Sequence, residues 1–307
     1  MSSRMRALLV AFVGNLLPLL SPATVALVAM RKGTNEGALV LLFSVLSLVL
    51  MSYVSELNLL MVWASVASVV VVLLGALLLK ATASWQSTLL MIVLLSAGSV
   101  AVMDVAMAEA MAKNVAQLRV NLLEMLGQMN APALNEASQL ELNQTGKSPV
   151  EQGQAGNSKP MALELGDQFI FGLLAWVVAI SSIASLVLGR WWQSLLYNPG
   201  GFAEEFRALR IQPPLALASL AGMTGCYLFS ADYVAWGNLL GLPLLVAGLA
   251  LVHHLVASAK KGAHWLAIFY ICLVLMLGPL SMLLLGLGLV DSVLDLRSRW
   301  ARRSGDI

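Results

Sequence analysis

The sequence predicts an all-α integral membrane protein, a polytopic bundle of about eight apolar segments. Hydrophobic residues make up 59% of the 307 residues and charged residues only 11%, with a mean hydropathy of +0.85. The apolar stretches run for about 18 residues or more, enough to cross a ~30 Å hydrocarbon layer at ~1.5 Å per residue. Lys and Arg gather between these stretches. Such a composition excludes an ordinary soluble domain and a nucleic-acid-binding domain.

The apolar stretches are continuous and lack the alternation of barrel strands, so they predict helices. They cover residues 7–30, 37–54, 57–79, 87–107, 168–189, 214–230, 232–258 and 265–292. The first stretch imitates a signal peptide, but it resumes after Ser21 and Pro22, which favours an uncleaved membrane segment. We therefore divide the chain into N-terminal membrane helices (1–107), a polar loop (108–167) and C-terminal membrane helices (168–307).

The distribution of basic residues predicts the topology. Apart from residues near the two termini, the bases fall in turns at 31–36, 80–86, 190–213 and 258–263, and in the polar loop. If every stretch crossed once, the bases would divide almost evenly between the two sides, which the positive-inside bias disfavours. If the first and last stretches each fold back, 14 of the 18 Lys and Arg residues share one side with both termini. The sequence thus predicts cytoplasmic termini and an extracytoplasmic loop.

Proline marks a break in both of these stretches. Pro18 and Pro22 interrupt the first, and Gly278-Pro279 interrupts the last; proline removes a backbone donor and clashes with the preceding turn. The last stretch, at about 28 residues or ~42 Å, is long for one crossing, whereas each half is short for one. A re-entrant hairpin satisfies the charges and a long kinked helix satisfies the length. The charges favour the hairpin, more strongly in the last stretch.

The loop at 108–167 divides into two parts. From Met111 to Ser138, apolar residues recur at helical spacing among charges, which predicts an amphipathic helix. From Asn143 to Pro160 the composition becomes Gln, Gly, Ser, Asn and Pro, which predicts a disordered connector.

Polar side chains inside the apolar stretches are the natural candidates for a site, because burying them unpaired costs several kcal/mol. Asn15 and Asn238 are candidate ligand-binding residues, with an interhelical hydrogen bond as the alternative for each. His253 and His254 are interpreted as interface residues. Asp291 and Asp295 lie one helical turn apart and suggest a Mg²⁺-diphosphate site, but nearby arginines favour a salt-bridged helix end. We predict no metal site and no cofactor.

A short amphipathic helix is predicted at 202–211, after a strong turn signal at 197–201. Phe202 and Phe206 recur at helical spacing, and Arg207 and Arg210 lie on the other side. These four residues predict a cytoplasmic interfacial helix, which either docks a partner or anchors the chain passively to the membrane.

The stretch WWQSLLYNPGGFAEEFRALRI at 191–211 resembles the central signature of the YybS-like bacterial membrane proteins, as do residues 241–262 and 288–299. That family is distantly similar in helix pattern to the S components of energy-coupling-factor vitamin transporters. In those proteins an Ala-x-x-x-Ala pair in the first helix packs on the coupling subunit. The resemblance therefore assigns partner coupling to Ala7 and Ala11, which have this spacing. This chain has at least two apolar segments more than a six-helix S component.

Two functions follow from this resemblance and from the lack of a phosphate-binding P-loop. The first is a solute-binding, transport-related subunit of the bacterial inner membrane. Its partners would be the bilayer and a membrane coupling subunit or ATPase that supplies energy. The alternative is a non-transporting scaffold or assembly factor that recruits partners through its cytoplasmic helix. An enzyme is disfavoured, since only Asp291 and Asp295 suggest an intramembrane transferase or protease.

Overall fold

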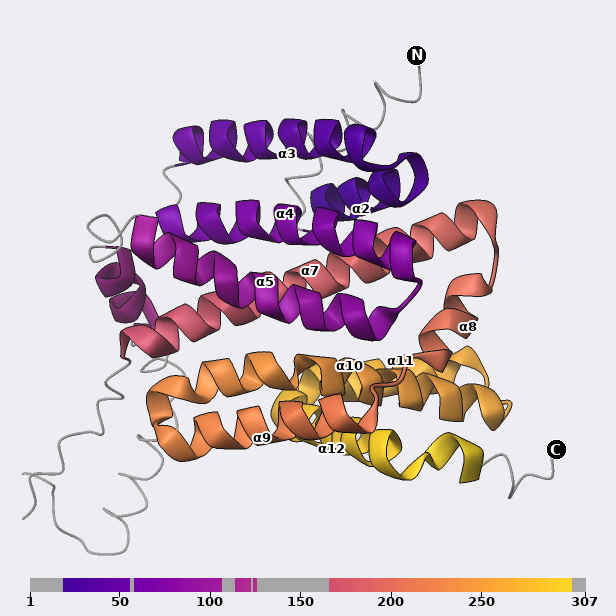
Figure 1. The fold of residues 1–307 in the computed structure, drawn as a ribbon. Helices are drawn as coiled ribbons and strands as arrows, with labels where there is room; N and C mark the ends of the chain where they lie inside the picture. Colours follow the sequence, from indigo (N-terminus) through magenta and orange to yellow (C-terminus); the bar gives the residue numbers. More distant parts are fainter. Residues whose placement is uncertain (1–18, 56–57, 107–113, 123, 126–165, 300–307) are drawn as a thin grey trace, which may run out of the picture.

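The computed structural model describes residues 19–55, 58–106, 114–122, 124–125 and 166–299 (Figure 1). Its elements in chain order are α2 (Leu20–Lys32), α3 (Thr34–Ser55), α4 (Leu59–Thr82), α5 (Trp85–Ala106), α7 (Asp167–Tyr197), α8 (Gly201–Ala208), α9 (Pro213–Phe229), η2 (Ala231–Tyr233), α10 (Val234–Ser258), α11 (Ala263–Leu275) and α12 (Leu277–Leu294). Six helices in this part of the chain are long and apolar enough to cross a membrane, whereas α9 and α11 are shorter. The all-α, polytopic fold class is thus confirmed.

The bundle has two halves that meet along α7 and α10. Helices α2, α4 and α5 pack around one side of α7, and α3 packs on α2 and α4. Helices α9, α11 and α12 gather around α10 (Figure 1). The 31-residue α7 contacts α2, α4, α5 and α10, and Ile170, Ala175 and Leu186 on it are fully buried. Helix α7 therefore connects the two halves of the bundle.

Helices α10 and α12 cross at unusually close range. A Cβ added to Gly248 would lie 1.9 Å from the Leu284 carbonyl oxygen, and one added to Gly288 would lie 2.1 Å from that of Leu244. Only glycine leaves room for such an approach. Helices in hydrocarbon associate through this kind of backbone packing, because lipid offers no hydrophobic driving force.

The basic turns lie together at one end of the bundle, which we call the basic end. The Arg31 guanidinium lies 3.6 Å from the centre of the Tyr197 ring, joining the end of α2 to the end of α7. The Lys80 ammonium lies near Gly33, so the α2–α3 and α4–α5 turns are also neighbours. Arg297, after α12, contacts Leu209, after α8. The four internal turns share one end in either topology, but Arg297, which follows the last apolar stretch, lies with them, as the fold-back of that stretch predicts.

The opposite end is built from the residues that flank the polar loop. The Asp232 carboxylate accepts a hydrogen bond from the Gly166 backbone at 3.1 Å, and Trp236 Nε1 donates to the Gln168 carbonyl at 2.9 Å. Residues 114–122 are helical, with Val115 buried and Leu118 packed against the core. The whole of the predicted connector at 143–160 lies outside the described residues, as does all of 126–165.

The last apolar stretch is a hairpin. Helix α11 runs back along α10, where the Tyr270 hydroxyl reaches His253, and the chain turns at Met276 with φ −123° and ψ 47°. Helix α12 then returns to the basic end. Pro279 lies in the first turn of α12, where its missing N–H has no intrahelical partner to lose. Helices α11 and α12 thus start and finish at the same end of the bundle, as the predicted re-entrant hairpin requires. The alternative prediction of one long kinked helix is wrong.

The first apolar stretch is described only in its second half. Helix α2 begins at Leu20, so Pro22 occupies its first turn, as Pro279 does in α12. Its 13 residues span about 20 Å, too short to cross the hydrocarbon layer alone. Pro18 and the residues before it lie outside the described part, and the first hairpin stays a prediction.

Candidate functional site

Helix α8 lies across the basic end, and a sharp turn holds it there. Gly200 has a φ of +90°, a conformation that residues with a side chain rarely adopt. The Ser194 hydroxyl donates to the Asn198 carbonyl at 2.7 Å and accepts from the Phe202 backbone at 3.1 Å. The end of α7 thereby ties both the turn and the start of α8.

One side of α8 is fixed by Glu205. Its carboxylate accepts from Arg190 Nη2 at 2.7 Å and Nε at 3.0 Å, and from Trp85 Nε1 at 2.7 Å. Arg190 belongs to α7 and Trp85 begins α5. Bidentate Arg–carboxylate pairing adds directional specificity to the charge attraction, so Glu205 links α8 to two neighbouring helices at once.

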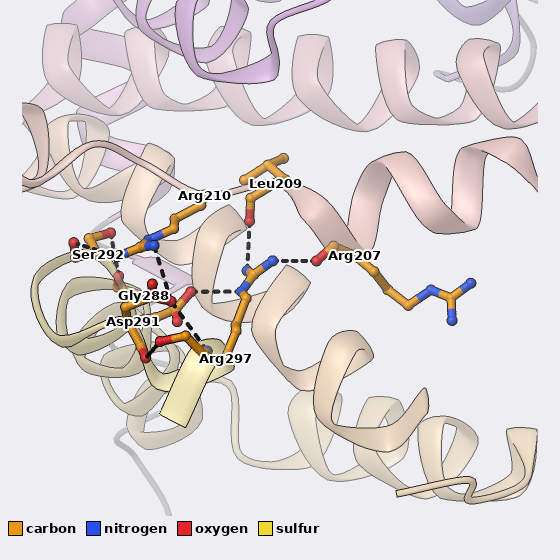
Figure 2. Close-up of polar contacts among 9 residues, drawn as sticks. Arg207, Leu209, Arg210, Gly288, Asp291, Ser292 and Arg297 are labelled. Atoms are coloured by element: carbon orange, nitrogen blue, oxygen red, sulfur yellow. Dashed lines mark hydrogen bonds and ion pairs between the residues drawn. The ribbon is translucent and has the colours of Figure 1, made fainter. Parts of the chain in front are cut away.

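The other side of α8 is fixed by Arg297, as Figure 2 shows. The Arg297 side chain donates from Nε to Asp291 Oδ2 at 2.9 Å, from Nη2 to the Leu209 carbonyl at 2.7 Å, and from Nη1 to the Arg207 carbonyl. The Asp291 side chain is 1% exposed and the Arg297 side chain 12%. Asp291 Oδ1 is buried and has no hydrogen-bond partner among the described residues. The pair therefore joins the end of α12 to the carbonyls that close α8.

A second ion pair lies beside the first and is more exposed. Arg210 pairs with Asp295 at 3.1 Å and also donates to the Ser292 carbonyl at 3.2 Å. Burial raises the pKa of the Asp295 carboxyl, but the Ser298 backbone N–H and the Arg210 guanidinium outweigh it, so the pKa lies below its ordinary value. The predicted salt-bridged helix end is confirmed for Asp291, which pairs with the nearby Arg297, whereas Asp295 pairs with Arg210 and not with the arginines that follow it in sequence. Within the described ranges, no three His, Cys, Asp or Glu side chains gather as metal ligands would.

The inner face of α8 is aromatic. Phe206 is buried and its ring meets His253 edge-on, with ring centres 5.2 Å apart. Phe202 packs on Phe206 at 5.6 Å. His253 Nδ1 lies 3.0 Å from the Leu249 carbonyl and so carries the proton, leaving Nε2 to accept from the Tyr270 hydroxyl at 3.3 Å. The imidazole thus connects α8 with α10 and α11.

Beneath α8 lies a cavity of about 950 Å³, which we call the α8 cavity; residues of α7, α8, α10 and α11 line it, together with Leu19. Its wall is mainly apolar and includes Ile183, Val187, Leu245, Val246, Leu249 and Leu266. The polar lining is confined to Ser194, Arg207, His253, Lys261 and Tyr270 among the described residues. Ligand sites in proteins have this character, an apolar chamber with a few placed polar groups.

Two other hollows in the bundle are smaller than the α8 cavity. One of about 650 Å³ adjoins it, shares Arg207 and Ala257 with it, and is lined by the polar residues around Arg210 and Arg297. The other, about 480 Å³, lies far from α8, among residues of α3, α4 and α7. In that hollow, the Ser68 and Ser181 hydroxyls are 3.0 Å apart and bond to each other. The α8 cavity is the largest of the three and has basic groups at one end.

The sequence candidates are only partly brought together. Phe202, Phe206 and Arg207 line the α8 cavity, and Arg210 lines the adjoining hollow. Asn238 lies on α10 away from both and accepts a hydrogen bond from the Tyr227 hydroxyl of α9 at 2.6 Å, which is the interhelical alternative. Asn15, Ala7 and Ala11 lie outside the described residues.

Sequence reasoning did not select Tyr270 or Lys261, and it placed His253 only at an interface. Tyr270 lies inside a stretch that reads as uniformly apolar, and Lys261 reads as one of many topology-determining bases. The available signal was the hydroxyl of Tyr270, a polar group inside an apolar stretch that the charges predict to fold back. Without the hairpin, nothing in the pattern relates Tyr270 to His253.

The fold and composition define the class: an integral membrane protein with several spanning helices and a lipid-facing surface rich in exposed apolar side chains. No family model, curated protein or solved structure matches the chain. The likeness to YybS-like proteins therefore stays a prediction.

Proposed function

We propose that this protein is a solute-binding membrane subunit whose ligand is an elongated, largely apolar molecule held in the α8 cavity. The cavity itself carries the proposal. It offers about 950 Å³ behind a mainly apolar wall, the size of a drug-like or lipid-like ligand site. A water-soluble solute with many polar groups would leave them unpaired there, at a cost of several kcal/mol.

The protein groups around the cavity support a preformed site. His253 and Tyr270 bond to each other, and Glu205 and Arg297 fix α8 from two sides. A wall held in this way keeps its shape without the ligand, which lowers the ordering cost of binding.

The proposal extends to a transport-related role in the bacterial inner membrane, with the basic end cytoplasmic. The sequence shows no P-loop, so energy would come from a partner subunit. Coupling through Ala7 and Ala11, as the likeness to S components implies, belongs to this proposal. The concentration of bases at one end supports the orientation, because cytoplasmic loops carry the excess of Lys and Arg.

The scaffold alternative is less well supported. It assigns recruitment to Phe202, Phe206, Arg207 and Arg210. Phe206 is buried against His253, and Arg210 is paired with Asp295. Side chains that are already buried or paired within the protein offer few free contacts to a binding partner.

Photolabelling with a neutral, diazirine-bearing hexadecanol tests the proposal. Peptide mapping should place the label on the faces of α7, α10 and α11 that line the cavity. Leu249→Trp fills the cavity and should abolish this labelling. Leu94→Trp is the matched control, because Leu94 is 70% exposed on α5 and remote from the cavity. Equal labelling of all lipid-facing helices, unaffected by Leu249→Trp, would refute a specific site.

A further inference from the structure

Among the described residues, two basic side chains at the α8 cavity have no acidic partner. Arg207 donates from Nε to the Ala203 carbonyl of its own helix at 2.8 Å, and its guanidinium points away from the Arg297 pair (Figure 2). The Lys261 ammonium lies 5.5 Å from the centre of the Trp265 ring. In the part of the chain that the structure describes, neither makes an ion pair and no acid lines this cavity.

The other bases around α8 are neutralised. Arg190 is 2.7 Å from Glu205, Arg210 is 3.1 Å from Asp295, and Arg297 is 2.9 Å from Asp291. Glu204, in the adjoining hollow, is exposed. The uncompensated positive charge next to the apolar wall is therefore that of Arg207 and Lys261.

The charge lies at one end of the cavity and the apolar wall extends from it into the bundle. Along α10 the lining runs from Leu245 to Ala257, which lie twelve positions or about 18 Å apart. That length is close to half of a ~30 Å hydrocarbon core, the depth of a single leaflet. Trp191, which also lines the cavity, is 45% exposed on α7 near the basic end, and indole rings favour the headgroup region. A molecule with its charge at Arg207 and its chain along α10 would thus be oriented like a membrane lipid.

Few polar groups remain for recognising an uncharged head. The Ser194 hydroxyl already bonds Asn198 and Phe202, and the His253 and Tyr270 side chains bond each other. Recognition at the charged end is consequently electrostatic.

We propose that the ligand of the α8 cavity is an anionic amphiphile, a lipid chain with a phosphate-bearing head, and that the phosphate lies between Arg207 and Lys261. This inference rests on the proposed function and names its substrate class. Arg207 supplies two guanidinium nitrogens for a bidentate contact, and Lys261 supplies a mobile point charge.

The test uses the full-length protein in neutral maltoside micelles with two photoreactive lipids. Phosphatidylglycerol and phosphatidylcholine carry the same diazirine acyl chain and differ only in the head. We expect cavity peptides to be labelled about tenfold more by the anionic lipid, because the choline cation of phosphatidylcholine cancels the charge of its phosphate and is repelled by the two bases. Arg207→Gln/Lys261→Gln should bring the ratio close to one.

Lys32→Gln/Arg299→Gln is the control. It removes two exposed bases from the basic end, and neither residue lines the cavity. Its labelling ratio should equal that of the wild type. Thermal unfolding in the same detergent should show both double variants folded, since the Arg207 carbonyl still accepts from Arg297.

The outcomes separate this inference from the proposed function. Equal labelling of the cavity by both lipids would overturn the anionic class while leaving the cavity as a binding site. Loss of the label from the cavity for both lipids, as well as for hexadecanol, would overturn both. If millimolar inorganic phosphate alone displaced the anionic lipid, the site would be one for a free anion, and the amphiphile proposal would fail.

Discussion

Asp291 and Arg297 are the residues whose chemistry depends most on their surroundings. Both are nearly buried. Arg297 also donates hydrogen bonds to the backbone carbonyls of Arg207 and Leu209 at the end of α8, which would otherwise lack partners. A buried ion pair adds little net stability against an apolar replacement, but removing one partner leaves an uncompensated charge. Asp291 Oδ1 has no hydrogen-bond partner among the described residues, so this carboxylate depends on Arg297 for its stabilisation.

Asp291→Ala should destabilise the protein by about 3–5 kcal/mol, because the Arg297 charge then lacks its counter-ion. Unfolding in a graded series of SDS in neutral micelles measures the difference. Asp295→Ala is the control: its side chain is 44% exposed, so the expected loss is at most about 1 kcal/mol. The double replacement Asp291→Leu/Arg297→Met should recover part of the loss. Equal effects of the two single variants would contradict this account.

Among elements, the contact of α10 with α12 determines how the re-entrant hairpin is held. Helix α11 has only 13 residues, and α12, with 18, is just long enough to cross the hydrocarbon layer. The close approach at Gly248 and Gly288 supplies the packing that holds α12 in place.

Gly248→Ala should destabilise the protein by about 3 kcal/mol, because the new Cβ would meet backbone rather than a flexible side chain. Gly286→Ala lies on the same helix as Gly288, and its Cβ would meet nothing within 4 Å. It should be neutral or stabilising by up to ~1 kcal/mol through helix propensity. The same SDS titration measures both. A harmless Gly248→Ala would show that the helices separate more easily than their packing indicates.

Across the whole molecule, the positions of charge and of hydrocarbon-length helices combine into one topology. The basic turns share one end, and residues flanking the polar loop share the other. Because cytoplasmic loops carry the excess of bases, the basic end should face the cytoplasm.

Cysteine labelling tests this orientation in a background where Cys226 and Cys272 are replaced by serine. Ala81→Cys places a thiol at the basic end and Ala231→Cys at the opposite end; both positions are exposed. In intact cells an impermeant maleimide should react with the thiol at 231 only, and both should react after the membrane is opened. Reaction at 81 in intact cells would reverse the orientation.

The sequence by itself determined the fold class, the boundaries of most helices and the sharing of one end by the basic turns. These follow from hydrophobicity and charge along the chain, which act locally through the cost of placing each residue in hydrocarbon. It also predicted a break in the first and the last stretch; the first, at Pro18 and Pro22, stays a prediction, and for the last the sequence left the hairpin and the kinked helix as alternatives. Only the tertiary structure decided for the hairpin there.

Only the tertiary structure decided the site as well. The α8 cavity joins Val187, Phe206, Leu249 and Tyr270 from four helices, and the pairing of Arg210 with Asp295 spans 85 positions. Neither follows from periodicity, because a pattern shows which face of a helix is apolar but not which helix covers it. In a membrane this ambiguity is greatest, since lipid and protein are equally apolar surroundings and close packing alone selects the neighbour.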